Sequence, residues 1–366
     1  MVEVKTSASI AEFREALLEK FLAFLWRQWS ALGIMGASDT EEDWILDPEP
    51  LLVFSLEIGR YEPRLFDEIL SWLWANGHRL DTARLKKILL ESKLEETARV
   101  VGGSLHYIAE AALSRKWKSI IEFGREKFMV YSKEHKPAPL FKLKSGAPHP
   151  MAEQKDTDPM FAEFGLNRPR IKNLRQGAEV PVDAQANIRF LLRSLFGVGA
   201  RSECILYLLT HESGHPSEIA DVTGYFWLTI RDALEDLADS KIVLTRSRGK
   251  RVEYWLSHKR WWDFIGCAGV EDQPKPKWLH WLAVYAALSQ LWRTVDEPAQ
   301  RQDSEYMTAS KLQDSLEILH REFTRAGVDV PTIPGAGLPP DLQQKTAVRF
   351  LSRIFGLEYD ESSHHA

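Results

Sequence analysis

The sequence has few cysteines, no excess of basic residues and no long apolar run. Only two cysteines, Cys204 and Cys267, occur in 366 residues, and they do not form a C-x-x-C pair. We therefore expect neither a disulfide scaffold nor a zinc ribbon, and a reducing cytoplasm is the natural location. The apolar run at residues 21–26 is too short to cross a membrane, and residues 1–20 lack the apolar segment of a signal peptide, so no membrane partner is expected.

The charge balance and the absence of known phosphate-binding and nucleophile motifs exclude further functional classes. The formal net charge is -5, with 47 basic and 52 acidic residues, so any nucleic-acid binding must come from a local patch. The sequence contains no G-x-x-x-x-G-K-[ST] or G-x-G-x-x-G phosphate-binding loop and no G-x-S-x-G nucleophile elbow. We therefore expect a protein that is not an enzyme, with no catalytic residues and no cofactor.

Two strings suggest a metal site at first sight. His211 to His215 satisfies H-E-x-x-H, but the zinc motif needs both histidines on one helical face. Gly214 and the step from His215 to Pro216 oppose a continuous helix, so we expect no metal there. The acids within residues 39–49 could form a metal or general-acid cluster, but an acidic surface loop is the interpretation we prefer.

The spacing of apolar residues predicts a mainly α fold. Residues 1–132 carry apolar side chains three and four apart, which indicates an N-terminal all-α domain of unknown role. Residues 133–183 hold seven of the chain's 18 prolines, which indicates a linker or an extended arm. We prefer a solvated connector over an arm that touches phosphate or a partner.

The C-terminal part is predicted to be helical again. Residues 267–366 form this region, and tryptophans from Trp278 to Trp292 lie on a wide apolar stripe. A stripe this wide must be buried. Core burial is the first interpretation, and the interface of a homodimer is the second.

Between these regions, residues 184–266 predict three helices followed by a hairpin. Pro216 suits the first turn of a short helix, and a third helix is expected from Tyr225 to Asp239. Residues 241–256 alternate as two strands with Gly249 at the tip, where a positive φ costs little.

This segment resembles the winged helix-turn-helix of bacterial regulators of the ArsR and MarR type. The resemblance rests on "EIA" in the second helix, "LEDLADSKIV" at the exit from the third and "RSRGKRVEYWL" in the wing, and it covers about residues 187–260. It implies a transcriptional regulator whose third helix enters the major groove of double-stranded DNA. It also implies that the wing lies along the backbone or minor groove, and that the protein is a homodimer.

The resemblance, together with the charge of the wing, gives the candidate DNA contacts. Arg231 would read guanine, Thr229 or Tyr225 would reach a phosphate or a thymine methyl group, and Arg248 would probe the minor groove. The candidates are Tyr225, Trp227, Thr229, Arg231, Arg246, Arg248, Lys250 and Arg251.

The third helix departs from the family pattern because it begins with aromatic residues. Residues 225–228 are Tyr, Phe, Trp and Leu, and acids follow them. Residues 187–260 hold eleven basic and nine acidic residues, so only modest DNA affinity is expected unless a dimer doubles the wings. The alternative is an interaction module, antitoxin-like or regulatory, that binds a protein partner through Tyr225, Phe226 and Trp227.

Overall fold

The computed structural model describes residues 2–35, 44–132, 137–153, 156–171, 174, 177–249, 251–265, 276–296, 305–333 and 340–355. These residues form fifteen α-helices, four short 3-10 helices and two small sheets, which confirms a mainly α fold. The α-helices are α1 (Val2–Ala31), α2 (Pro48–Ile58), α3 (Pro63–Asn76), α4 (Thr82–Ser92), α5 (Glu95–Ala111), α6 (Lys118–Ser132), α7 (Pro159–Ala162), α8 (Ile188–Phe196), α9 (Ala200–Thr210), α10 (Pro216–Thr223), α11 (Trp227–Asp239), α12 (His258–Phe264), α13 (Trp281–Asp296), α14 (Glu305–Arg325) and α15 (Pro340–Ile354). No helix in these ranges is long and apolar enough to cross a membrane.

The remaining elements are short. The 3-10 helices are η1 (Gly59–Tyr61), η2 (Gly77–Arg79), η3 (Pro150–Glu153) and η4 (Gln185–Asn187). The strands are β1 (Ala138–Pro139), β2 (Leu166–Asn167), β3 (Leu244–Arg248) and β4 (Arg251–Trp255). β1 and β2 pair in parallel, whereas β3 and β4 form an antiparallel hairpin.

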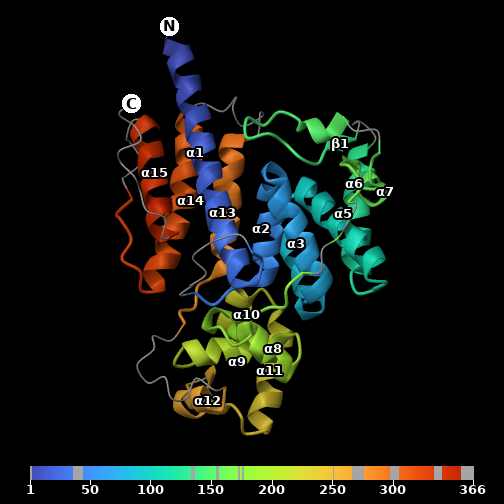
Figure 1. The fold of residues 1–366 in the computed structure, drawn as a ribbon. Coiled ribbons are helices and arrows are strands. Elements are labelled where there is room, and N and C mark those ends of the chain that lie inside the picture. Colours follow the sequence, from blue (N-terminus) through green and yellow to red (C-terminus); the bar gives the residue numbers. More distant parts are fainter. Residues whose placement is uncertain are drawn as a thin grey trace.

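Most helices form one large bundle, and α8 to α12 lie together at one end of it (Figure 1). The long helix α1 runs beside α13 and α15, while α3, α5 and α6 lie on the other side of α2. The start of α1 and the end of α15 lie at the end of the bundle that is remote from α8 to α12. The molecule therefore has a broad helical body and a narrower end.

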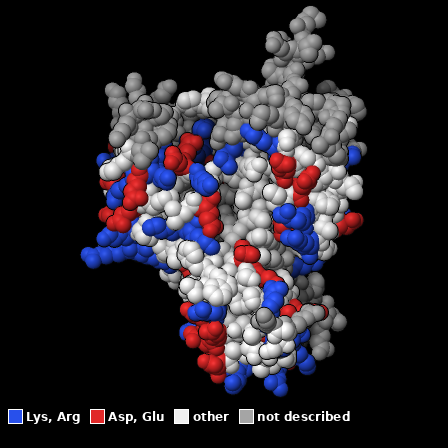
Figure 2. Space-filling view, turned by 180° about the vertical axis from the view of Figure 1, so that it is seen from behind, with Lys and Arg blue, Asp and Glu red and all other residues white. Residues whose placement is uncertain are grey.

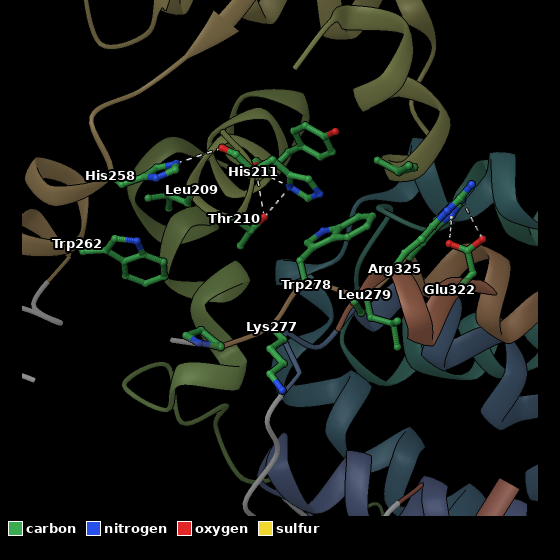
Figure 3. A pocket seen from close by; sticks show the side chains of 15 residues that line it. Leu209, Thr210, His211, His258, Trp262, Lys277, Trp278, Leu279, Glu322 and Arg325 are labelled. Carbon is green, nitrogen blue, oxygen red and sulfur yellow. Dashed lines mark hydrogen bonds and ion pairs between the residues drawn. The ribbon is translucent and has the colours of Figure 1, made fainter. Parts of the chain in front are cut away.

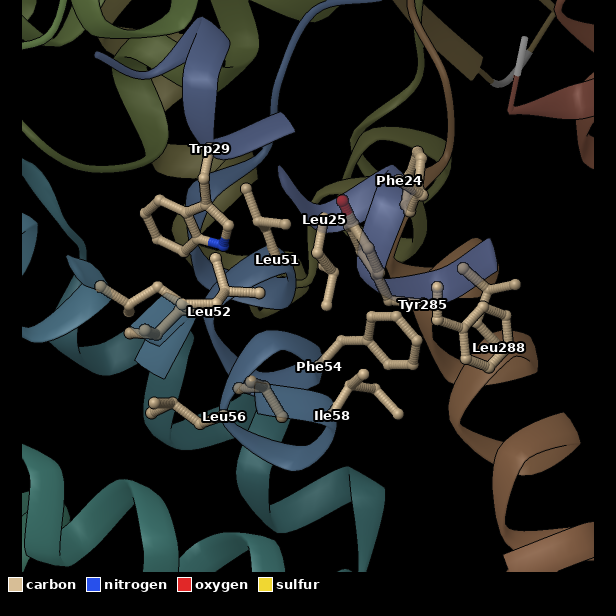
Figure 4. Close-up of a cluster of buried hydrophobic side chains, with 14 of the residues drawn as sticks. Phe24, Leu25, Trp29, Leu51, Leu52, Phe54, Leu56, Ile58, Tyr285 and Leu288 are labelled. Atoms are coloured by element: carbon tan, nitrogen blue, oxygen red, sulfur yellow. The ribbon is translucent and has the colours of Figure 1, made fainter. Parts of the chain in front are cut away.

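Helix α2 occupies the centre of the bundle. Its sequence is apolar on every side, and each of its residues except Glu57 is buried. A helix that is apolar all round needs neighbours on every face. α1 and α13 supply two of them: Phe54 lies 5.3 Å from Phe21 and 5.5 Å from Tyr285, ring centroid to ring centroid (Figure 4).

The described part of residues 137–183 is packed on the bundle and is not a solvated connector. Its buried apolar side chains are Leu140, Phe141, Phe161, Phe164, Leu166 and Val180. Its main chain is also bound, because Arg99 donates hydrogen bonds to the carbonyl oxygens of Phe164 and Gly165, and Arg60 donates to that of Leu140. The prolines prevent a helix there, but the aromatic residues between them anchor the segment.

The C-terminal helices share the core of the N-terminal helices. Trp281, Tyr285, Leu288 and Trp292 of α13 are buried beside residues of α1 and α2, which confirms the first interpretation of the apolar stripe. Because the stripe is covered within the chain, it no longer argues for a dimer. The regions 1–132 and 267–366 thus contribute to one core rather than to two.

Residues 188–265, called the terminal unit below, have a separate core. Its buried side chains come from α8 to α12 and the hairpin. Cys204 lies in this core as a free thiol, whereas Cys267 lies outside the described residues. Helix α8 joins the two cores, because Phe190 packs in the bundle while Ile188 and Leu192 pack in the terminal unit.

Candidate nucleic-acid interface and its junction with the bundle

The connection from α9 to α11 is fixed by local capping. The His215 side chain accepts a hydrogen bond from the Ser217 amide at the start of α10, and the Glu218 carboxylate accepts one from the His215 amide. At the other end of α10, Gly224 adopts the left-handed conformation (φ 75°) and turns the chain towards α11. The histidines of the H-E-x-x-H string therefore lie in a turn, where one of them caps a helix.

Helix α11 presents an apolar beginning to solvent. Ile230, Leu234 and Leu237 face the core, as their spacing predicts. Phe226 is 66% exposed, Trp227 45% and Leu228 54%. Thr229 is exposed as well. Two of the predicted contacts on this helix, Trp227 and Thr229, are thus accessible.

Tyr225 is the predicted DNA contact that the structure removes from the surface. Its side chain is buried at 8% exposure, and its hydroxyl donates a 2.6 Å hydrogen bond to the Asp81 carboxylate of the bundle. Burial, reinforced by the charge of Glu203, raises the pKa of Tyr225 well above its usual value. Tyr225 was predicted to contact DNA, but the turn before α11 packs against the start of α4. There the Tyr225 side chain contacts Asp81 of the same chain and is not accessible.

The hairpin arginines are exposed but already paired. Arg246 donates to Glu253 on the opposite strand, at 2.9 Å from its Nε, and also to Ser213. Arg251 pairs with Glu218 of α10 at 2.9 Å. Lys250 and the side chain of Arg248 lie outside the described part of the chain.

Acidic groups also surround the remaining predicted contact. Arg231 pairs with Asp232 at 2.7 Å and with Glu235 at 3.6 Å, and its guanidinium lies 5.1 Å from the centre of the Trp227 ring. The space-filling view shows an acidic strip next to basic side chains at the narrow end of the molecule (Figure 2). The surface of the terminal unit is therefore mixed in charge, and Arg231, Arg246 and Arg251 bind carboxylates of the same unit.

A buried network of charges joins the terminal unit to the bundle. Arg84 of α4 is its centre: the guanidinium donates to Asp47 and Glu49, each at 2.6 Å. Its Nε donates at 2.6 Å to the carbonyl oxygen of Thr223 at the end of α10. A side chain of the bundle thus binds the turn that precedes α11.

Helix α8 supplies two further arginines to this network. Arg193 pairs with Glu49 at 2.7 Å and with Glu203 of α9 at 2.9 Å. Arg189 pairs with Asp47 and lies 3.6 Å from Glu203. All of these side chains are at most 3% exposed, so three arginines and three carboxylates neutralise one another away from solvent.

The carboxylates of the network are held in their charged form. Burial alone would raise the pKa of Asp47, but the guanidiniums of Arg189 and Arg84 more than offset it and hold the pKa well below the ordinary value of 3.8. Arg193 and Arg84 likewise lower the pKa of Glu49. Both groups are therefore ionised at neutral pH, and their charge is compensated by arginine rather than by water.

The sequence analysis missed this network. Asp47 and Glu49 belong to the stretch interpreted as an acidic surface loop, yet both are buried, so that interpretation is wrong for them. Two signals were present in the sequence. The acids flank Pro48 at the start of a very apolar helix, and Arg189 and Arg193 lie four residues apart on an amphipathic one. A charge on an apolar helix usually needs a partner.

The described residues contain no group of three or more His, Cys, Asp or Glu side chains that could hold a metal ion. The chain matches no known protein-family model, no curated protein and no solved structure.

Proposed function

We propose that residues 188–265 are a winged helix-turn-helix and that the protein binds double-stranded DNA through it as a transcriptional regulator. The observation that carries the proposal is the order of elements: α9, α10, the tight turn at Gly224, α11 and then an antiparallel hairpin, all around one core. In this arrangement α11 would enter the major groove and the hairpin would follow the backbone or minor groove.

The contact surface differs from the one that the sequence suggested. Tyr225 is excluded by its burial, and the bundle covers the turn before α11. The accessible contacts are Trp227, Thr229 and Arg231 on the helix and Arg246 and Arg251 of the hairpin. Because exposed ion pairs stabilise a protein by about 0.2–1 kcal/mol, these arginines can exchange a carboxylate for a phosphate at small cost. We therefore expect modest affinity that depends strongly on salt.

The test is fluorescence anisotropy of a labelled generic duplex, titrated at low and at raised salt. We expect Arg248→Gln/Lys250→Gln/Arg251→Gln to weaken binding and to reduce the slope of log K against log salt by about 2–3, because each lost phosphate contact removes about 0.9. The control is Arg115→Gln/Lys118→Gln/Lys345→Gln, which neutralises three exposed cations outside the terminal unit. Equal behaviour of the two triple variants would contradict the proposal.

A homodimer belongs to the same proposal, because two wings on one duplex would raise the modest affinity of a single unit. Sedimentation equilibrium with and without duplex measures this directly. A monomer mass in both conditions would remove the dimer from the proposal and leave the DNA contact of each unit to be judged by the salt titration.

A second candidate function, a module that binds a protein partner, is favoured by one specific observation. Phe226, Trp227 and Leu228 are adjacent and exposed, and Phe226 and Trp227 line an open groove of 870 Å³ between the terminal unit, α4 and α13. Exposed aromatic residues beside a groove are typical of binding hot spots. Trp227→Ala would then abolish co-purification of a partner while sparing DNA binding, whereas Trp74→Ala, an exposed tryptophan of α3, would not.

A further inference from the structure

A cavity of 580 Å³ lies between the terminal unit and the bundle (Figure 3). The end of α9 and helix α12 form one wall with Thr210, His211 and Trp262. Residues 276–280 and the end of α14, which carries Arg325, form the other. The volume lies within the range of about 300–1,000 Å³ that is usual for small-molecule sites.

Aromatic rings dominate the lining, and Trp278 is the central one. Its ring meets those of Tyr207 and His211 almost perpendicularly, at centroid distances of 6.0 Å and 5.1 Å. Tyr207 and His211 are themselves stacked at 3.9 Å. These contacts fix the orientation of a half-buried indole, and Trp262 stands across the cavity from it (Figure 3). A flat ring is the shape that such a lining accommodates best.

The charges at the edge of the cavity are unequal. Its one carboxylate, Glu322, is 4% exposed and is neutralised by Arg321 at 2.8 Å and Arg325 at 3.3 Å. Lys277 is exposed and lies 5.7 Å from the centre of the Trp44 ring, and it pairs with no carboxylate of the described residues. In Figure 3, Arg325 lies beside Trp278 with its guanidinium at Glu322, whereas Lys277 extends from the chain at another edge of the lining, so Lys277 is the cation of the lining that is not held by Glu322.

Two histidines of the lining, His211 and His280, supply hydrogen-bonding groups without charge. Burial lowers the pKa of His211, and it lowers that of His280 despite the nearby Glu322. Both imidazoles are therefore neutral at pH 7, where each has one donor and one acceptor nitrogen. The Thr210 hydroxyl adds a further polar group at the same wall.

We propose that this cavity binds a small planar heteroaromatic anion, with its ring against Trp278 and its phosphate or carboxylate group at Lys277. The site goes beyond the proposed DNA contact and does not depend on it, because none of its lining residues belongs to α11 or the hairpin. A ligand there touches both the terminal unit and the bundle, so its binding raises the thermal stability of their junction.

The test is isothermal titration calorimetry of the full chain with AMP, supported by thermal unfolding. Adenosine, which lacks the phosphate, and ribose 5-phosphate, which lacks the base, are the matched ligands, and we expect both to bind at least about tenfold more weakly than AMP. Indole-3-acetate is the carboxylate counterpart. Binding of AMP alone assigns a phosphate ligand, and binding of indole-3-acetate alone assigns a carboxylate.

Two variants separate the charge from the ring. Lys277→Gln should weaken AMP binding about tenfold and leave adenosine unaffected, because a charge-assisted contact is lost. Lys345→Gln is the matched control, because Lys345 is an exposed lysine that does not line the cavity. Trp278→Leu should weaken the binding of both AMP and adenosine. If Trp278→Leu does not fold, Lys277→Gln still tests the site.

Several results would overturn the proposal. One is the absence of saturable binding for both AMP and indole-3-acetate. Another is equal affinity for AMP and adenosine, and a third is AMP affinity that is the same in Lys277→Gln and in the wild type.

Discussion

Two sets of arginines in this protein make the same kind of pair in opposite surroundings. Arg84, Arg189 and Arg193 bind carboxylates where no side chain of the network is more than 3% exposed. Arg246 and Arg251 bind carboxylates at the surface, with their own side chains more than half exposed. The first set joins the core of the bundle to that of the terminal unit, and the second lies on the surface of the hairpin.

The difference in burial determines whether the arginines of each set can change partners. A buried arginine that loses its partner leaves an uncompensated charge, which costs about 3–5 kcal/mol, so the junction holds one arrangement. An exposed pair contributes about 0.2–1 kcal/mol and is screened by salt, so its arginine can change partners. The junction therefore fixes the terminal unit, while Arg246 and Arg251 of the hairpin can exchange their partners.

The largest expected effect comes from breaking the buried set. Arg84→Met should lower the free energy of unfolding by about 3–5 kcal/mol, because Asp47 and Glu49 lose a shared partner and the Thr223 carbonyl loses its donor. Urea titration followed by circular dichroism measures it. Arg246→Met is the matched control, with an expected change below about 1 kcal/mol. Equal losses for the two variants would show that burial does not set the strength of these pairs.

The second effect is on pH dependence. Because the pKa values of Asp47 and Glu49 are lowered in the folded protein, the unfolded chain binds protons first as the pH falls. The network's contribution is thus complete above the ordinary values of 3.8 and 4.5 and is lost below them, by about 1.4 kcal/mol per pH unit for each additional proton bound.

The comparison with Arg84→Met isolates this contribution from that of other carboxylates. The difference in unfolding free energy between wild type and variant should narrow as the pH is lowered from about 6 to about 3. Urea titrations at several pH values measure it. A difference that stays constant would mean that the charges of Asp47 and Glu49 do not depend on Arg84.

The sequence predicted the secondary structure well and the division of the chain poorly. Apolar spacing identified the helices and the stripe from Trp278 to Trp292, because periodicity records which face of a helix is buried. It does not record what covers that face. The sequence therefore could not show that α13 packs on α1 and α2, or that Phe161 and Phe164 anchor the proline-rich segment.

The candidate site was only partly predictable for a related reason. The hairpin and the inward residues of α11 follow from alternation and spacing, which are local signals. The burial of Tyr225 and the network around Arg84 depend on pairs such as Arg84 and Thr223, which are 139 residues apart in the chain. No local pattern encodes a contact across that separation.

Removing the carboxylate partner of an exposed arginine should have the smallest effect on stability. It is informative because the duplex affinity is expected to rise rather than to fall. Glu253→Gln removes the carboxylate that holds Arg246 at 2.8 Å, so it should change the free energy of unfolding by less than about 1 kcal/mol. The freed guanidinium can then contact phosphate, and we expect duplex affinity at low salt to rise about two- to fivefold. Anisotropy measures it, with Glu126→Gln, an exposed acid of α6, as the control. A gain of affinity cannot arise from general damage to the fold, whereas a loss would mean that Glu253 positions Arg246 rather than competing for it.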